Sequence, residues 1–120
     1  MSSSYEFIAI SKSKLDDAEI DPSINNNLYT IDEYGYDLGS YNCNHFPDSV
    51  IDLIRAKFTK PETRYIKVDN NIALTMMRDC AKLAIDENDE FSDIAYIAST
   101  VYHVLNQHQT ENINVYCQIL

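Results

Sequence analysis

Hydrophobic positions alternate with a period of two near both ends of the chain. Residues 5–10 (Tyr-Glu-Phe-Ile-Ala-Ile) are rich in β-forming side chains and apolar on both alternating faces, which predicts a strand inside a sheet rather than at its edge. Residues 112–118 alternate cleanly. One side holds Ile113, Val115 and Cys117, and the other holds Asn112, Asn114, Tyr116 and Gln118. This pattern predicts a second strand whose polar side faces solvent.

Three segments between these strands carry apolar residues at helical spacing. Their stripes are Val50, Ile51, Ile54 and Phe58; Ala73, Met76, Met77, Cys80, Leu83 and Ala84; and Ile94, Ile97, Ala98, Val101, Val104 and Leu105. Asp48 is suited to cap the first helix and Lys60-Pro61 to stop it, while Asn70-Asn71 is suited to cap the second. Residues 64–68 are expected to form a short strand, and the third helix is expected over about 90–107.

The order of these elements predicts an α+β fold, with a small antiparallel sheet that includes both terminal strands and about three helices packed on one of its faces. A length of 120 residues and a hydrophobic content of 45% fit a single domain over residues 1–120. Residues 1–4 are expected to form a loose N-terminus, and the polar segments 11–27 and 32–47 to form surface loops. A short hairpin over 28–38, turning at a glycine, is also expected in this region.

The formal charge of −10 is segregated along the chain instead of being evenly mixed. The segments 15–54 and 83–120 contain no Lys or Arg, so that all nine cations lie at Lys12, at Lys14 or within residues 55–82. Such a field repels nucleic acid and anionic membranes, and it attracts basic protein surfaces. Direct binding to a DNA or RNA backbone also requires clustered Lys and Arg. The predicted partner is therefore a basic protein surface, without direct nucleic-acid or membrane binding.

The acidic segments also hold tyrosines, which suit a protein interface. Tyrosine supplies contact area at a small cost in conformational entropy, and carboxylates pair with Arg and Lys of a partner. The residues predicted to bind the partner are Asp32, Glu33, Tyr34, Tyr36, Asp37, Tyr41, Asp86, Glu87, Asp89 and Glu90. In contrast, Tyr5, Tyr65 and Tyr102 are expected to complete the core, with their hydroxyls at the surface.

No catalytic, metal or cofactor site is predicted from the residues. Cys43 lies two residues from His45, but its surroundings are anionic, which disfavours a reactive thiolate. The histidines and the cysteine weighed as zinc ligands are Cys43, His45, His103 and His108. They lack the paired spacing that a zinc site needs, and residues 86–97 lack the glycine and the final acidic residue of a calcium-binding loop. The chain is accordingly expected not to be an enzyme and to need no cofactor.

Two classes of function remain open. The first is a non-enzymatic inhibitor or interaction protein that docks its acidic surface on a basic, nucleic-acid-handling protein. It takes two forms: a nucleic-acid mimic, as in phage anti-defence and anti-CRISPR proteins, or an immunity protein or antitoxin that covers a basic toxin. The alternative is a homo-oligomeric domain, for example a homodimer, that holds a small ligand with the C-terminal strand and the loops, as a ligand sponge does.

The cysteines and the distribution of apolar residues predict a location. The chain has three cysteines with irregular spacing, no basic leader before its first apolar run and no segment of about 20 apolar residues. An odd number of thiols fits a reducing compartment better than a disulfide framework. We therefore expect a cytoplasmic protein, with Cys80 and Cys117 in the core as small hydrophobic residues.

Overall fold

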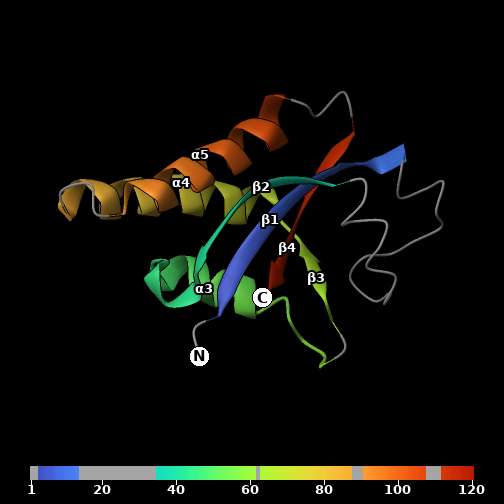
Figure 1. Cartoon of the computed structure of the whole chain (residues 1–120), viewed down its shortest axis with the longest axis horizontal. Coiled ribbons are helices and arrows are strands. Elements are labelled where there is room, and N and C mark those ends of the chain that lie inside the picture. The colour runs from blue at the N-terminus through green and yellow to red at the C-terminus, as the bar shows by residue number, and fades with distance from the viewer. Residues whose placement is uncertain (1–2, 14–34, 62, 88–90, 108–111) are drawn as a thin grey trace.

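The computed structural model describes residues 3–13, 35–61, 63–87, 91–107 and 112–120 (Figure 1). Its elements, in chain order, are β1 (Ser4–Ser11), β2 (Tyr36–Asn42), the 3-10 helix η1 (Cys43–His45), α3 (Asp48–Arg55), β3 (Tyr65–Lys67), α4 (Asn70–Asp86), α5 (Ser92–Gln107) and β4 (Ile113–Ile119). Most of the loop expected over 11–27, and most of the hairpin expected over 28–38, lie outside the described residues.

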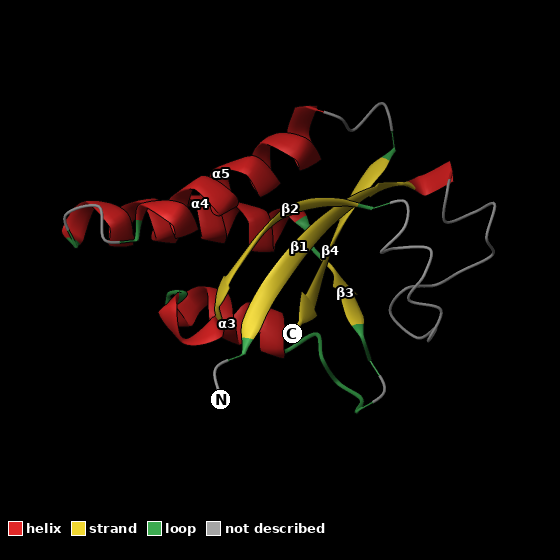
Figure 2. Ribbon diagram, in the orientation of Figure 1, coloured by secondary structure: helices red, strands yellow, loops and turns green. Residues whose placement is uncertain are grey.

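Four antiparallel strands form one sheet in the order β2-β1-β4-β3 (Figures 1 and 2). The strand nearest the N-terminus, β1, and the strand nearest the C-terminus, β4, pair at its centre, in a register that runs from Tyr5 opposite Ile119 to Ser11 opposite Ile113. Helices α4 and α5 pack against each other, α5 contacts β2 and β4, and α3 packs on α4. The predicted α+β fold, with both terminal strands in the sheet and three helices, is confirmed.

The core between the sheet and the helices contains side chains from every strand and helix described. Tyr5 and Phe7 of β1 and Cys117 of β4 point into it, where they meet residues of all three helices, including Cys80 of α4. The helices therefore cover the same face of the sheet. Burial of this cluster stabilises the fold by about 25 cal/mol per Å² of apolar surface removed from water. The predicted core positions of Cys80 and Cys117 are confirmed, since neither is exposed.

The opposite face of the sheet carries a second, smaller cluster. Ile8 and Ile10 alternate with the core residues of β1 and meet Tyr65 and Tyr116. β1 is thus buried on both faces, which confirms the prediction of an interior strand. The predicted solvent-facing side of residues 112–118 is wrong at Tyr116, which is only 6% exposed. Tyr116 lies directly across from Ile8, and a tyrosine ring gains from burial wherever its hydroxyl finds a partner.

Residues 36–42 form an edge strand where the sequence predicted part of a loop. The register between β2 and β1 shifts after Phe7, which marks a bulge. Gly39 lies in this bulge with a φ of +125°, and a Cβ atom there would lie 2.9 Å from Ile97 Cγ1. The N–H of Gly39 donates to Asp37 Oδ1 at 2.8 Å. Glycine is therefore required both by the backbone angle and by the close approach of α5.

Two helices begin differently from the prediction. α4 is capped by Asp69, whose Oδ1 accepts the N–H of Ile72 at 2.8 Å, while Asn70-Asn71 forms the first turn instead of the cap. α3 includes Asp48 as its first residue and follows Pro47, which makes no side-chain capping bond. In each case the cap lies one residue earlier than predicted, because the sequence signal for a helix start spans several neighbouring polar residues.

Candidate functional site

The edge strand β2 runs along α5 in the opposite chain direction (Figure 1). Gly39 in β2 packs on Ile97 of α5. Further along β2, the ring of Tyr41 lies beside that of His45, with centroids 5.6 Å apart, and His45 lies beside Phe91 at a centroid distance of 5.6 Å. Phe91 immediately precedes α5, so the end of β2 lies near the start of that helix.

This row of three rings connects the two segments that lack Lys and Arg. Tyr41 and His45 belong to the first of these segments, and Phe91 belongs to the second. His45 is exposed, whereas Tyr41 and Phe91 are half-buried against the core. The two segments that meet along the row therefore contribute carboxylates and aromatic rings but no Lys or Arg.

Asp93 and Tyr96 extend the row along α5. Both are exposed, and Asp93 precedes Ile97 by one helical turn, on the flank of the helix that contacts β2. Tyr36 in β2 and Tyr96 are the most exposed aromatic residues, at 74% and 73%, in the part of the chain that the structure describes. We define the β2–α5 surface by Tyr36, Tyr41, His45, Phe91, Asp93 and Tyr96. Asp37 is not part of it, because it pairs with Ile8 and therefore points to the other face of the sheet. The exposed rings of the β2–α5 surface are typical of protein interfaces, and Asp93 gives it a negative charge.

Of the predicted partner-binding set, Tyr36 and Tyr41 lie on this surface, whereas Asp37 lies on the same strand but points to the opposite face of the sheet. Asp86 and Glu87 lie at the C-terminal end of α4, a few residues before Phe91 in the chain. Asp86 pairs with Lys82 at 2.9 Å, so its charge is partly compensated. The other predicted partner-binding residues, Asp32, Glu33, Tyr34, Asp89 and Glu90, lie outside the described residues.

Four members of the β2–α5 surface were not predicted: His45, Phe91, Asp93 and Tyr96. Tyr96 lies off the apolar stripe of its helix, so helical periodicity alone indicates its exposure. The contact of His45 with Phe91 joins residues far apart in the sequence, and no local pattern indicates it. Long-range contacts of this kind depend on how the whole sheet and helices pack.

Cys43, weighed above as a nucleophile, is only 8% exposed. Burial raises the pKa of its thiol, and a backbone hydrogen bond and the nearby Arg55 offset this effect only in part. Burial likewise raises the pKa of Cys80 to about 12. A thiol that is buried and protonated is a poor nucleophile at neutral pH. The chemistry of Cys43 is therefore that of a core residue.

Neither a metal centre nor a membrane span is found in the described ranges. No group of three His, Cys, Asp or Glu side chains lies close enough there to hold a metal ion. No helix in the same ranges combines the length and the apolar character needed to cross a bilayer.

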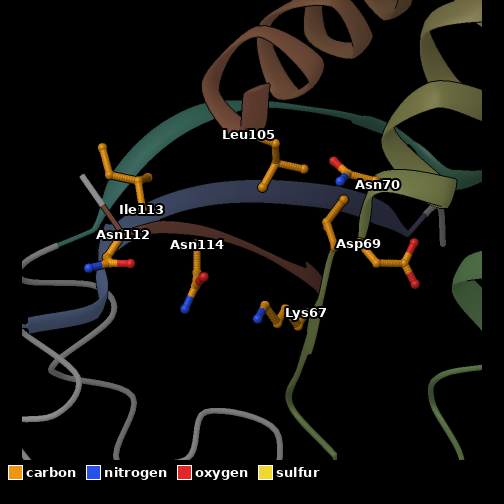
Figure 3. A pocket seen from close by; sticks show the side chains of 8 residues that line it. Lys67, Asp69, Asn70, Leu105, Asn112, Ile113 and Asn114 are labelled. Carbon is orange, nitrogen blue, oxygen red and sulfur yellow. The ribbon is translucent and has the colours of Figure 1, made fainter. Parts of the chain in front are cut away.

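A second candidate site is a pocket of about 320 Å³ beyond the end of β3 (Figure 3). Its lining residues are Lys67, Val68, Asp69, Asn70, Leu105, Asn112, Ile113 and Asn114. Asp69 also caps α4 and pairs with Lys57 Nζ at 3.0 Å. Partial burial raises the pKa of Asp69, but the N–H of Ile72 and the Lys57 ammonium lower it by more, so the pKa of this carboxyl group lies below its ordinary value.

Comparison of the chain with protein-family models, with curated proteins and with solved structures found no match.

Proposed function

We propose that the chain is a non-enzymatic binding protein that docks its β2–α5 surface on a basic surface of another protein and inhibits it. The row of Tyr41, His45 and Phe91 carries this proposal, because it joins two segments without Lys or Arg into one aromatic and acidic surface. Nucleic-acid-handling proteins present the clustered Lys and Arg that such a surface complements. A nucleic-acid mimic and an immunity protein for a basic toxin are two forms of this function.

Carboxylates on or beside the surface are available to a partner. Asp93 and Glu87 form no ion pair with any other described residue. The exposed rings of Tyr36 and Tyr96 offer faces on which arginine guanidinium groups stack. An arginine-rich partner therefore satisfies both features, and its association should weaken as salt screens the charges.

Docking through side chains fits β2 better than the addition of a partner strand. Strand addition requires a regular row of outward N–H and C=O groups at the sheet edge. The bulge at Gly39 interrupts this row, and the N–H of Gly39 is bound by the carboxylate of Asp37. Edge strands carry such bulges as a protection against pairing with other chains. Asp37 consequently supports the strand itself, which makes Asp93 the cleaner residue for a binding test.

The test compares two charge reversals of equal size. Asp93→Lys reverses a carboxylate of the β2–α5 surface, and Asp52→Lys reverses an exposed carboxylate of α3 outside it. Wild type and both variants serve as baits for capture from a lysate at about 50 and 500 mM salt, and the retained basic protein is then purified and titrated with each bait. We expect Asp93→Lys to weaken binding by about 10- to 100-fold and Asp52→Lys by less than about threefold.

A charge-neutral variant and an activity assay complete the test. Tyr96→Ala should weaken binding by about tenfold, because exposed aromatic side chains are frequent interface hot spots. The purified partner should also lose its nucleic-acid binding when the chain is added. Equal binding by every bait, or binding that does not respond to salt, contradicts the proposal. Circular dichroism of each variant verifies that the fold is retained.

A further inference from the structure

The pocket beyond β3 exists because β3 and β4 separate there. The N–H of Val68 donates to the C=O of Val115 at 2.8 Å, and the chain then leaves the sheet to enter α4. β4 pairs with β1 from Ile113 onward, so its first residues have β1 on one side and the pocket on the other. Backbone groups alternate between the two sides of an antiparallel strand. The C=O of Val115 points towards β3. Ile113 lies two residues earlier, so its N–H and C=O point to the same side, where the pocket replaces β3.

The side chains around this backbone edge form a polar wall on one side of β4 and a mainly apolar wall on the other (Figure 3). Lys67, Asn112 and Asn114 lie on the first side, and Leu105, Ile113 and Asn70 lie on the second. Within the described ranges, the side chains of Lys67 and of both asparagines form no hydrogen bond or ion pair. The polar wall thus offers amide donors and acceptors and one uncompensated positive charge.

Asn112 is held at the edge of the pocket by its own backbone. Its φ is +54°, in the left-handed region, and its C=O accepts the N–H of Lys12 at 2.7 Å. Asparagine tolerates this conformation better than most residues other than glycine. A backbone fixed in this way limits the conformational freedom that the side chain would lose on binding a ligand.

One positive charge of the pocket lining, that of Lys67, has no ion-pair partner among the described residues. Lys67 lines the pocket, and the exposed residues Lys60 and Arg64 precede it in the sequence. Among the described residues of the lining, Asp69 holds the one carboxylate, which pairs with Lys57 and turns away from the polar wall (Figure 3). Of the described residues, an anionic ligand would therefore meet the ammonium group of Lys67 and no free carboxylate in the lining.

We propose that this pocket binds a mononucleotide. A nucleobase presents hydrogen-bond donors beside acceptors, which pair with the backbone N–H and C=O of Ile113 and with the amide of Asn114. The face of the base packs on Leu105, and the phosphate pairs with Lys67. A volume of about 320 Å³ lies at the lower end of ligand pockets, which suits one nucleotide rather than a longer oligomer. The site is independent of the β2–α5 surface and lies at the C-terminal strand, where the sequence-based alternative expects a small ligand.

In the test, the isotope-labelled full chain is titrated separately with adenosine monophosphate, adenosine and inorganic phosphate. The backbone N–H signals are followed by nuclear magnetic resonance. We expect saturable shifts of the Ile113 and Asn114 backbone N–H signals with adenosine monophosphate. Adenosine should bind about tenfold more weakly, because it lacks the group that pairs with Lys67. Inorganic phosphate should give no saturable shift at Ile113, because it has no base to occupy the backbone edge.

Two lysine variants of equal charge change separate the site from the general field. Lys67→Met should abolish the difference in affinity between adenosine monophosphate and adenosine, whereas Lys60→Met should retain it. Both lysines are exposed, so both variants are expected to fold, which circular dichroism verifies. Three results would each overturn the site: no saturable shift at Ile113 up to about 5 mM ligand, equal affinity for inorganic phosphate and the nucleotide, or equal losses in the two lysine variants.

Discussion

The two edge strands of the sheet are protected in different ways. β2 is seven residues long, and its protection comes from its backbone. It has a bulge, a glycine in close contact with α5, and a hydrogen bond from the N–H of Gly39 to the carboxylate of Asp37. β3 is three residues long and ends where Asp69 caps α4 and pairs with Lys57. Free N–H and C=O groups of an edge strand can pair with another chain, so a bulge and a short length both limit unwanted association.

Charge differs between the same two edges. The β2–α5 surface carries Asp93 and no Lys or Arg, whereas the chain around β3 carries Lys60, Arg64 and Lys67. The strand order places these edges at opposite ends of the sheet. At physiological salt, exposed charges interact over only about 8 Å, so the two fields act locally. Under the two proposals, one fold offers an acidic surface to a basic protein at one edge of the sheet and a pocket lined by Lys67 to a small anion at the other.

The largest effect on stability is expected at the bulge of β2. Gly39→Ala would place a Cβ atom 2.9 Å from Ile97 Cγ1 and hold an L residue at a φ of +125°. Together these effects should lower the free energy of unfolding by about 2–4 kcal/mol, measured by urea denaturation. Ser40→Ala, at the exposed neighbouring position, is the matched control and should change it by less than about 0.5 kcal/mol.

A double variant separates the two causes at Gly39. Ile97→Ala removes the overlapping atoms but leaves the backbone strain, so adding Gly39→Ala in that background should be less harmful than in the wild type. We expect a coupling energy of about 1 kcal/mol in the resulting double-mutant cycle. Strictly additive losses would mean that β2 does not depend on α5, and the account of how this edge is held would be wrong.

Periodicity predicted the fold wherever the chain keeps a regular period. The interior position of β1 and the helical stripes follow from spacing alone, as do the core positions of Cys80 and Cys117. Only the start of β2 was predicted, as the end of a hairpin at residue 38, because the bulge breaks the alternation. Leu38 and Tyr41 both pack towards the core although they are three residues apart. A period-two pattern cannot indicate such a strand.

The candidate site was less predictable than the fold. Composition located the acidic, tyrosine-rich segments, and helical periodicity is sufficient to predict that Tyr96 is exposed. The contacts that assemble the β2–α5 surface, from Tyr41 to His45 and from His45 to Phe91, are tertiary. The pocket beyond β3 has the same origin, because it depends on where two strands separate rather than on a sequence motif.

An intermediate effect is expected at the β3 end, where Asp69 caps α4. Asp69→Ala removes the side-chain oxygen that accepts the N–H of Ile72 and the partner of Lys57. The free energy of unfolding should fall by about 1–2 kcal/mol, mostly from the lost cap, since the exposed ion pair contributes little. Asp69→Asn is the control, because it keeps a capping oxygen, and its loss should be smaller than that of Asp69→Ala.

The same residue gives the β3 end a pH dependence. The pKa of Asp69 in the folded chain lies below its ordinary value of 3.8, so its charged form contributes stability that is fully present above that pH. This contribution is lost as the pH falls through the lower pKa of the folded chain. Wild type should therefore exceed Asp69→Asn in stability at neutral pH, and the difference measured in urea titrations should shrink as the pH falls below 3.8. A constant difference across this range would rule out the charge of Asp69 as its cause.

The smallest effect on stability is expected at the exposed rings of the β2–α5 surface. Tyr36 and Tyr96 are 74% and 73% exposed, so Tyr36→Ala and Tyr96→Ala remove little buried area. Each should change the free energy of unfolding by less than about 0.5 kcal/mol. Tyr102→Ala is the control, because Tyr102 is half-buried against the core, and it should cost about 1–2 kcal/mol. If Tyr36→Ala or Tyr96→Ala lowers the free energy of unfolding as much as Tyr102→Ala does, the exposed rings stabilise the fold. The β2 edge would then have a structural role, as the β3 edge has through the cap of α4, and the two edges would no longer differ in this respect.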